Sequence, residues 1–168
     1  NELLSYRFEP TKDPCHVESV TLTGPKGPLP VQLSDVEYWP GTRMVKSATL
    51  WMVAELSPLT TDAYFVRYGA TPSDKSDTQG DLKISVTPGQ AEMATSRFGV
   101  RLPLGVETFE PARDCSETPG PMAAMRMADG TWFGGSRLFG TAKLIGWSGR
   151  LVVSGPVFGQ VEYTYRYE

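Results

Sequence analysis

The chain has 168 residues, which is the size of one ordinary domain and leaves little room for a catalytic domain beside a separate binding module. Hydrophobic residues make up 40% and charged residues 21%, which excludes a disordered chain. The net charge of -3 and the lack of a basic cluster exclude the phosphate-neutralising surface of a nucleic-acid-binding protein. No run approaches about 18 consecutive apolar residues, so no membrane-spanning helix is predicted.

Turn-forming residues divide the whole chain into short segments. The 17 glycines and 14 prolines leave few windows long enough for a helix. Strand-like runs recur between them at the spacing of an all-β sandwich or barrel. The expected strands are 3–9, 17–23, 31–39, 47–56, 63–68, 82–87, 91–96, 98–102, 123–128, 131–133, 144–147, 151–154 and 157–167. We therefore predict a single antiparallel β-sandwich domain over 1–168, with a closed β-barrel as the alternative.

The run 47–56 has the clearest alternation. Its even-numbered residues, among them Leu50 and Met52, are apolar, whereas Thr49, Trp51 and Glu55 lie between them. Period two places the first set on one face of a strand and the second set on the other. We expect the first face in the core and Trp51 packed against an adjacent layer.

Two further segments define the organisation. Residues 69–80 have no apolar periodicity and are predicted to form a long surface loop. Asp129-Gly130 between two strand-like runs predicts a hairpin with a type I′ turn. The chain begins without Met and ends inside a strand-like run, which is typical of a processed protein or of a fragment of a larger chain.

Residues 45–56 and 63–69 resemble the early strand pair of β-sandwich domains that open large bacterial polysaccharide-degrading proteins. The segment 154–167, which contains Gly-Pro-Val-Phe-Gly, resembles a strand of the same supersandwich proteins, among them exo-acting rhamnogalacturonan lyase-like proteins. Gly159 stands where that pattern often has Ala. The resemblance implies an accessory, non-catalytic domain of a secreted protein and carries over no catalytic residue. Its implied location is extracellular or periplasmic.

The cysteines and the single histidine offer little chemistry. His16 is the only histidine, and Cys15 and Cys115 are not at a metal-ligand spacing, which argues against a structural zinc site. If paired, the two cysteines would close a loop of about a hundred residues in an oxidising compartment, which could stabilise the fold by up to about 4.7 kcal/mol. We favour this disulfide over two unrelated free thiols.

Acidic residues could pair in several ways. Asp35 with Glu37, or Glu107 with Glu110, would serve a glycosidase if two carboxylates faced each other across a cleft. A loop with three aspartates could supply oxygen ligands to calcium, although it lacks EF-hand spacing. These aspartates are Asp74, Asp77 and Asp81. We expect a solvated loop and no cofactor, with calcium as the alternative.

Aromatic residues near turns are the best functional candidates. Tryptophan rings stack on the apolar faces of sugars while polar neighbours bind the hydroxyl groups. Trp39 precedes Pro40-Gly41, and Trp132 follows the Asp129-Gly130 turn. We predict that Trp39 and Trp132 bind a ligand, with Arg43 and Asp129 as their polar partners. Trp147 lies beside Ser148-Gly149, a third position near an expected turn.

Three functions follow from these features. We expect a carbohydrate-binding or accessory module that contacts a polysaccharide or oligosaccharide. A second hypothesis is a structural sandwich that packs against a catalytic domain of the parent chain, with the row Tyr163, Tyr165 and Tyr167 in the packing surface. A third is a small sandwich-fold glycoside hydrolase or polysaccharide lyase.

Overall fold

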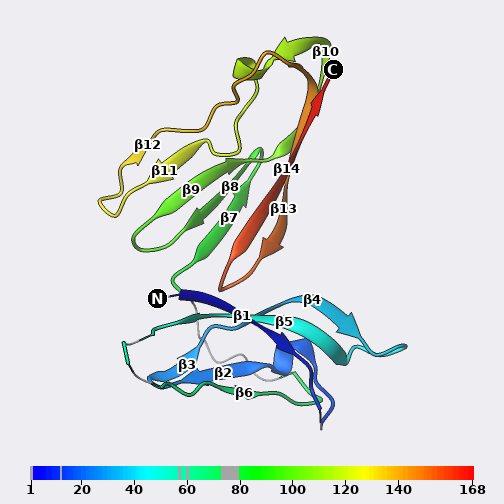
Figure 1. Ribbon diagram of the computed structural model, residues 1–168, viewed down its shortest axis with the longest axis vertical. Coiled ribbons are helices and arrows are strands. Elements are labelled where there is room, and N and C mark those ends of the chain that lie inside the picture. The colour runs from blue at the N-terminus through cyan, green and yellow to red at the C-terminus, as the bar shows by residue number, and fades with distance from the viewer. Residues whose placement is uncertain (1, 12, 57, 60, 73–79) are drawn as a thin grey trace. The chain divides into compact units, whose positions relative to one another are not determined.

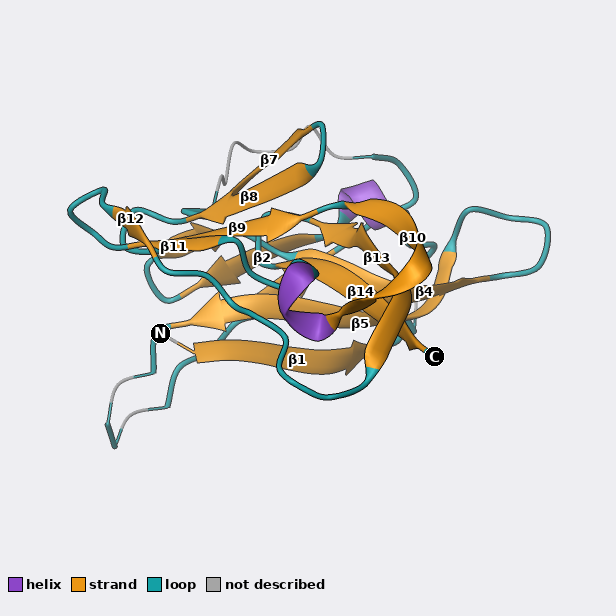
Figure 2. Cartoon of the chain, turned by 90° about the horizontal axis from the view of Figure 1, so that it is seen from above, coloured by secondary structure: helices purple, strands orange, loops and turns teal. Residues whose placement is uncertain are grey.

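The structure is a computed structural model that describes residues 2–11, 13–56, 58–59, 61–72 and 80–168. These residues form fourteen β-strands and two short 3-10 turns, η1 (Val17–Ser19) and η2 (Cys115–Glu117) (Figures 1 and 2). The strands pair antiparallel in four sheets, and none of the sheets in these described ranges closes into a barrel. The predicted all-β, antiparallel sandwich class is confirmed. No helix among the same residues is long and apolar enough to cross a membrane.

The chain divides into two compact units, residues 1–80 and 81–168. The first unit contains β1 (Glu2–Phe8), β2 (Thr21–Gly24), β3 (Gly27–Leu29), β4 (Gln32–Tyr38), β5 (Val45–Ala54) and β6 (Phe65–Arg67). The second contains β7 (Lys83–Thr87), β8 (Gln90–Ala94), β9 (Gly99–Pro103), β10 (Gly105–Asp114), β11 (Ala124–Arg126), β12 (Trp132–Phe133), β13 (Lys143–Ser154) and β14 (Gly159–Tyr167). That residues 1–168 form a single domain stays a prediction.

The first unit contains two three-stranded sheets, ordered β1-β5-β4 and β3-β2-β6, and two clusters of buried apolar residues. The central strand β5 shows the predicted alternation, since its even-numbered residues from Ala48 to Ala54 are buried. Met52 and Ala54 contact Leu22 of the opposite sheet, and Leu50 belongs to a cluster with Cys15 and Val20. Burial of this apolar face provides the main stabilisation of the unit.

The predicted strand 17–23 is shorter than expected. Residues Val17–Ser19 form η1 instead, and β2 starts only at Thr21. The hydroxyl of Ser19 donates to the carbonyls of His16 and Gly69 and accepts the Gly69 N–H, at 2.6 to 2.9 Å. These side-chain hydrogen bonds compete with strand pairing, which explains the turn.

The second unit contains a five-stranded sheet, ordered β12-β11-β9-β8-β7, and a three-stranded sheet, β10-β13-β14. The three-stranded sheet contributes Phe109, Leu144 and Trp147 to a buried cluster with Cys115. Tyr163 and Tyr165 of β14 pack against this cluster. The sheets meet closely at Gly159, where a Cβ would lie 2.5 Å from the Ile84 side chain and 2.8 Å from that of Met93.

The prediction of two strands at 144–147 and 151–154 was wrong, because β13 runs unbroken for 12 residues. Gly149 lies within the strand rather than in a turn. A Cβ there would lie 2.7 Å from the Tyr163 ring and 2.8 Å from the carbonyl oxygen of Pro103. The glycine therefore permits a close approach within the unit, and it does not reverse the chain.

Candidate functional site

Trp39 lies in the connection between β4 and β5 of the first unit. Its backbone N–H donates to the carbonyl of Met44 at 3.0 Å, and the Thr42 N–H donates to the Trp39 carbonyl at 3.0 Å. Gly41, at φ +73°, allows the tight reversal between them. These bonds fix the backbone while the side chain of Trp39 stays 52% exposed. The structure thus presents an indole on an ordered hairpin.

Two further exposed residues lie close to Trp39 in the chain. Tyr38 ends β4 and is 48% exposed, and Arg43 is exposed in the same connection as Trp39. Aromatic rings supply apolar contact area at low entropic cost, and a guanidinium donates hydrogen bonds to hydroxyl or carboxylate oxygens. That Trp39 and Arg43 bind a ligand stays a prediction.

Trp132 begins β12 in the second unit and lies beside two arginines. The Arg101 guanidinium lies 3.9 Å from the centre of the Trp132 ring, and that of Arg126 lies 6.0 Å from it. Nε of Arg101 also donates to Oε2 of Glu92 at 3.0 Å. We call Glu92, Arg101, Arg126 and Trp132 the Trp132 cluster.

Strand register explains why the Trp132 cluster assembles. Glu92 of β8 pairs with Arg101 of β9, and Arg101 pairs with Ala124 of β11. Arg126, two residues after Ala124, pairs with Trp132 of β12. These residues therefore share one face of the five-stranded sheet, opposite to the buried Met93. Only the small Ala124 intervenes on β11 between Arg101 and β12.

The predicted hairpin at Asp129-Gly130 is present, but its turn is not type I′. Among these residues only Gly130 has positive φ, at +89°, and its N–H donates to the Met127 carbonyl at 3.0 Å. A type I′ turn needs positive φ at both central residues. Oδ1 of Asp129 accepts the Thr131 N–H at 2.9 Å, so this carboxylate stabilises the turn. A ligand-binding role for Asp129 is untested.

The other two tryptophans serve packing in different ways. Trp51 lies in the middle of β5, as expected, and its Nε1 donates to Oγ of Ser34 at 2.9 Å. Trp147 lies inside β13 and is only 4% exposed, so the expected position near a turn was wrong. Trp39 belongs to the first unit and Trp132 to the second.

The expected carboxylate pair of β4 is disrupted. The β4–β5 register shifts between Ser34 and Glu37, and Asp35 adopts φ +50°, which breaks the alternation needed to align Asp35 with Glu37. Glu37 contacts Nζ of Lys46 at 3.3 Å, and this hydrogen bond lowers the pKa of Glu37 below its usual value. The glycosidase hypothesis gains no paired acid and base from these two residues.

The calcium alternative has little basis in the described residues. Asp74 and Asp77 lie outside them. Asp81 is described, and its carboxylate accepts the Ser96 N–H at 2.9 and 3.0 Å and the Ser96 hydroxyl at 2.8 Å. These bonds hold the pKa of Asp81 below its usual value. Across the described ranges, no three His, Cys, Asp or Glu side chains gather in a way that could hold a metal ion.

The expected disulfide between Cys15 and Cys115 is not formed. Both cysteines are free thiols, and both are buried. Cys15 is buried against Val45 and Leu50 in the first unit, whereas Cys115 belongs to a separate cluster in the second. Sγ of Cys115 lies 2.9 Å from the carbonyl oxygen of Ala142. Burial raises the pKa of the Cys15 thiol. Each cysteine therefore acts as a small apolar core residue.

Sequence reasoning missed Arg101 and Glu92. Their pairing was predictable, because the expected strands 91–96 and 98–102 are joined by a very short connection and therefore pair antiparallel. It also missed a pocket in the second unit, lined by Pro103, Pro119, Gly120, Met122, Ala123 and residues 134–137. The predicted Asp129-Gly130 hairpin was the available signal, because Met122 and Ser136 continue the antiparallel register of β11 and β12.

No family model matches the chain, and no curated protein and no solved structure shows significant similarity to it.

Proposed function

We propose that the chain is a non-catalytic carbohydrate-binding or accessory module whose principal glycan contact is the hairpin of Trp39. The half-exposed indole on a hydrogen-bonded β4–β5 connection is the observation that carries this proposal. A ring held on a fixed backbone loses little conformational entropy when it stacks on a sugar. Arg43 in the same connection supplies hydrogen-bond donors to sugar oxygens.

The Trp132 cluster supports the same activity as a second contact surface. Its ring and charged groups are oriented by the Glu92–Arg101 ion pair and by the contact of Arg101 with Trp132. Arg101 covers part of the Trp132 ring, which leaves less stacking area than Trp39 offers. We therefore rank Trp39 first and Trp132 second.

Retention in affinity gels that contain pectic or hemicellulosic polymers tests the proposal. The first polymer that retards the protein is then titrated while tryptophan fluorescence is measured. We expect Trp39→Ala to weaken binding at least about tenfold, which corresponds to about 1.4 kcal/mol. Tyr6→Ala is the matched control, because Tyr6 is 54% exposed on β1 of the same unit. Lack of retention by every polymer, or retention unchanged in Trp39→Ala and Trp132→Ala, would refute the proposal.

A polysaccharide-active host protein, and an extracellular or periplasmic location, extend this proposal. They rest on the resemblance of residues 45–56 and 154–167 to accessory sandwich domains. Two free thiols give no support to an oxidising compartment. Export from the cytoplasm, measured by fractionating cells that express the natural gene, tests the location.

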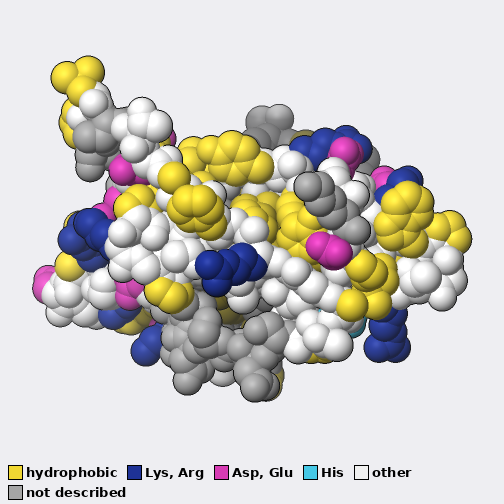
Figure 3. Space-filling view, turned by 90° about the horizontal axis from the view of Figure 1, so that it is seen from below, with side chains coloured by type: hydrophobic (Ala, Val, Ile, Leu, Met, Phe, Trp, Pro, Cys, Tyr) yellow, Lys and Arg dark blue, Asp and Glu magenta, His cyan; other side chains and the backbone are white. Residues whose placement is uncertain are grey.

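One observation favours packing against a catalytic domain as a second function. The strand β14 pairs with β13, and no other described strand pairs with its second edge. A nine-residue edge strand left open invites pairing with another chain segment. However, Tyr163 and Tyr165 pack within their own unit, against the buried cluster that contains Trp147 and Leu144. The face drawn in Figure 3, which is not that of β14, carries exposed hydrophobic side chains in several groups separated by polar and charged ones. Amide hydrogen exchange tests this function. In a natural chain that carries a catalytic domain beside this one, the amide hydrogens on both edges of β14 should be protected.

A further inference from the structure

Two segments of the second unit that flank the β11–β12 hairpin form a small pocket. Residues 119–123 precede β11, and residues 134–137 follow β12. Ser136 joins the segments: its hydroxyl accepts the Met122 N–H at 2.7 Å and donates to the Met122 carbonyl at 3.0 Å, and its own N–H donates to that carbonyl at 2.7 Å. Pro119 and Arg137 form a further β-bridge. The pocket is thus built on hydrogen-bonded backbone.

Glycines allow this close approach. A Cβ at Gly120 would lie 2.5 Å from the carbonyl oxygen of Ser136, and one at Gly135 would lie 2.7 Å from that of Ala123. No side chain fits between the segments at either position, so their spacing is set by backbone contact. A ligand therefore contacts a preformed surface, and little conformational entropy of the protein is lost on binding.

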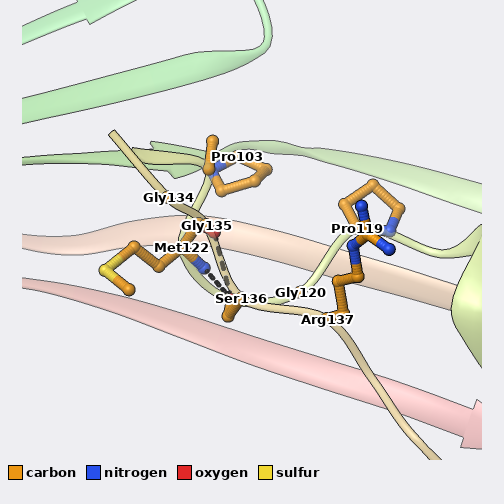
Figure 4. A pocket seen from close by; sticks show the side chains of 9 residues that line it. Pro103, Pro119, Gly120, Met122, Gly134, Gly135, Ser136 and Arg137 are labelled. Carbon is orange, nitrogen blue, oxygen red and sulfur yellow. Dashed lines mark hydrogen bonds between the residues drawn. The ribbon is translucent and has the colours of Figure 1, made fainter. Parts of the chain in front are cut away.

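The lining combines apolar walls with one cation. Pro103, Pro119, Met122 and Ala123 contribute apolar surface around a volume of about 470 Å³. Figure 4 shows Pro103 and Met122 on one side, and Pro119 on the other with the Arg137 side chain extended beside it. Arg137 is exposed, and its guanidinium makes no ion pair or hydrogen bond with any residue that the structure describes. The volume lies within the range typical of small-molecule sites.

We propose that this pocket binds a small organic carboxylate with an apolar body, and that Arg137 pairs with its carboxylate. A guanidinium offers parallel N–H donors that match a carboxylate, and charge-assisted bonds of this kind are stronger than neutral ones. The proline and methionine walls take up the apolar body of the ligand. The residues that line this pocket include none of the Trp132 cluster, and its ligand class does not depend on glycan binding.

Titration of the ¹⁵N-labelled protein with benzoate, and separately with benzyl alcohol, tests the pocket. For ligands of this size we expect a benzoate Kd on the order of 1 mM. Saturable shifts confined to the amides of Gly120, Met122, Ala123 and residues 134–137 are expected with benzoate, and benzyl alcohol should bind at least about tenfold more weakly. Arg137→Gln should lose at least about tenfold in benzoate affinity. The matched control Arg97→Gln changes an exposed arginine in a turn of the same unit and should bind like wild type.

Three results would overturn the inference: no saturable shift in these segments, equal affinity for the alcohol and the carboxylate, or wild-type affinity in Arg137→Gln. The amide spectrum of Arg137→Gln verifies that the variant is folded. Glycan retention should be unchanged in Arg137→Gln, so failure of the pocket and failure of the proposed function give different results. If Arg137→Gln lost both benzoate binding and glycan retention, the two ligands would not bind at separate sites.

Discussion

Substitutions of Trp147 measure how much the burial of its side chain contributes to the free energy of unfolding. The side chain is 4% exposed and packs with Phe109, Cys115 and Leu144, while its Nε1 is buried with no hydrogen-bond partner among the described residues. Trp147→Ala removes the whole ring and leaves a cavity, which costs about 3–5 kcal/mol. Trp147→Phe removes less apolar surface and also removes the unpaired N–H, whose burial costs about 1–3 kcal/mol. These two effects oppose each other, so we expect Trp147→Phe to lie within about 1 kcal/mol of wild type.

Urea unfolding followed by far-UV circular dichroism measures both variants without relying on tryptophan fluorescence. Trp39→Ala is the control, and its exposed position predicts a change within about 0.5 kcal/mol. If Trp147→Phe is destabilised as strongly as Trp147→Ala, then Nε1 has a partner or the full indole is needed for packing. A cost below about 1 kcal/mol for Trp147→Ala would show that β13 does not bury this residue.

Three further predictions concern backbone contact, proton binding and thiol state. Gly135→Ala should lower the free energy of unfolding by more than about 1 kcal/mol because its Cβ would clash with backbone, whereas Gly69→Ala, which meets nothing within 4 Å, should be nearly neutral in urea unfolding. Burial raises the pKa of Tyr163 to about 12 from its ordinary value of 10.0, so the unfolded phenol loses its proton first. Stability should therefore fall as pH rises from about 10 to 12, and Tyr163→Phe should flatten that fall in pH-dependent unfolding. Cys15 and Cys115 should react with a thiol reagent only after denaturation, without prior reduction, and a requirement for reductant would contradict the free thiols.

Period-two patterning predicted much of the fold because it reports burial directly. The alternation of β5 is visible in the sequence, since one face carries only apolar side chains and becomes the core. Gly149 shows the opposite case. A glycine beside a serine resembles a turn locally, and only the approach of Tyr163 and Pro103, both distant in sequence, explains why it lies inside a strand.

The candidate sites divide along the same line. The exposed position of Trp39 was predictable, because the turn residues Pro40-Gly41 end the strand directly after it. The contact between Arg101 and Trp132 depends on three strand registers at once, which no local pattern reports. The segments of the pocket at Arg137 continue the predicted Asp129-Gly130 hairpin, but the sequence does not show that Pro103 and the Arg137 side chain complete a pocket there. For Asp129, a side-chain hydrogen bond to Thr131 selected a turn that the dipeptide alone did not specify.

The central strands β5 and β13 each pair with a neighbour on both sides. Their amide hydrogens can exchange with solvent deuterons only when a whole unit opens, whereas edge strands such as β1 exchange through local fraying. The slowest amides of β5 therefore report the opening free energy of residues 1–80, and those of β13 report that of residues 81–168. Equal limiting values would indicate a single cooperative transition, and unequal values would mean that one unit opens while the other keeps its sheets.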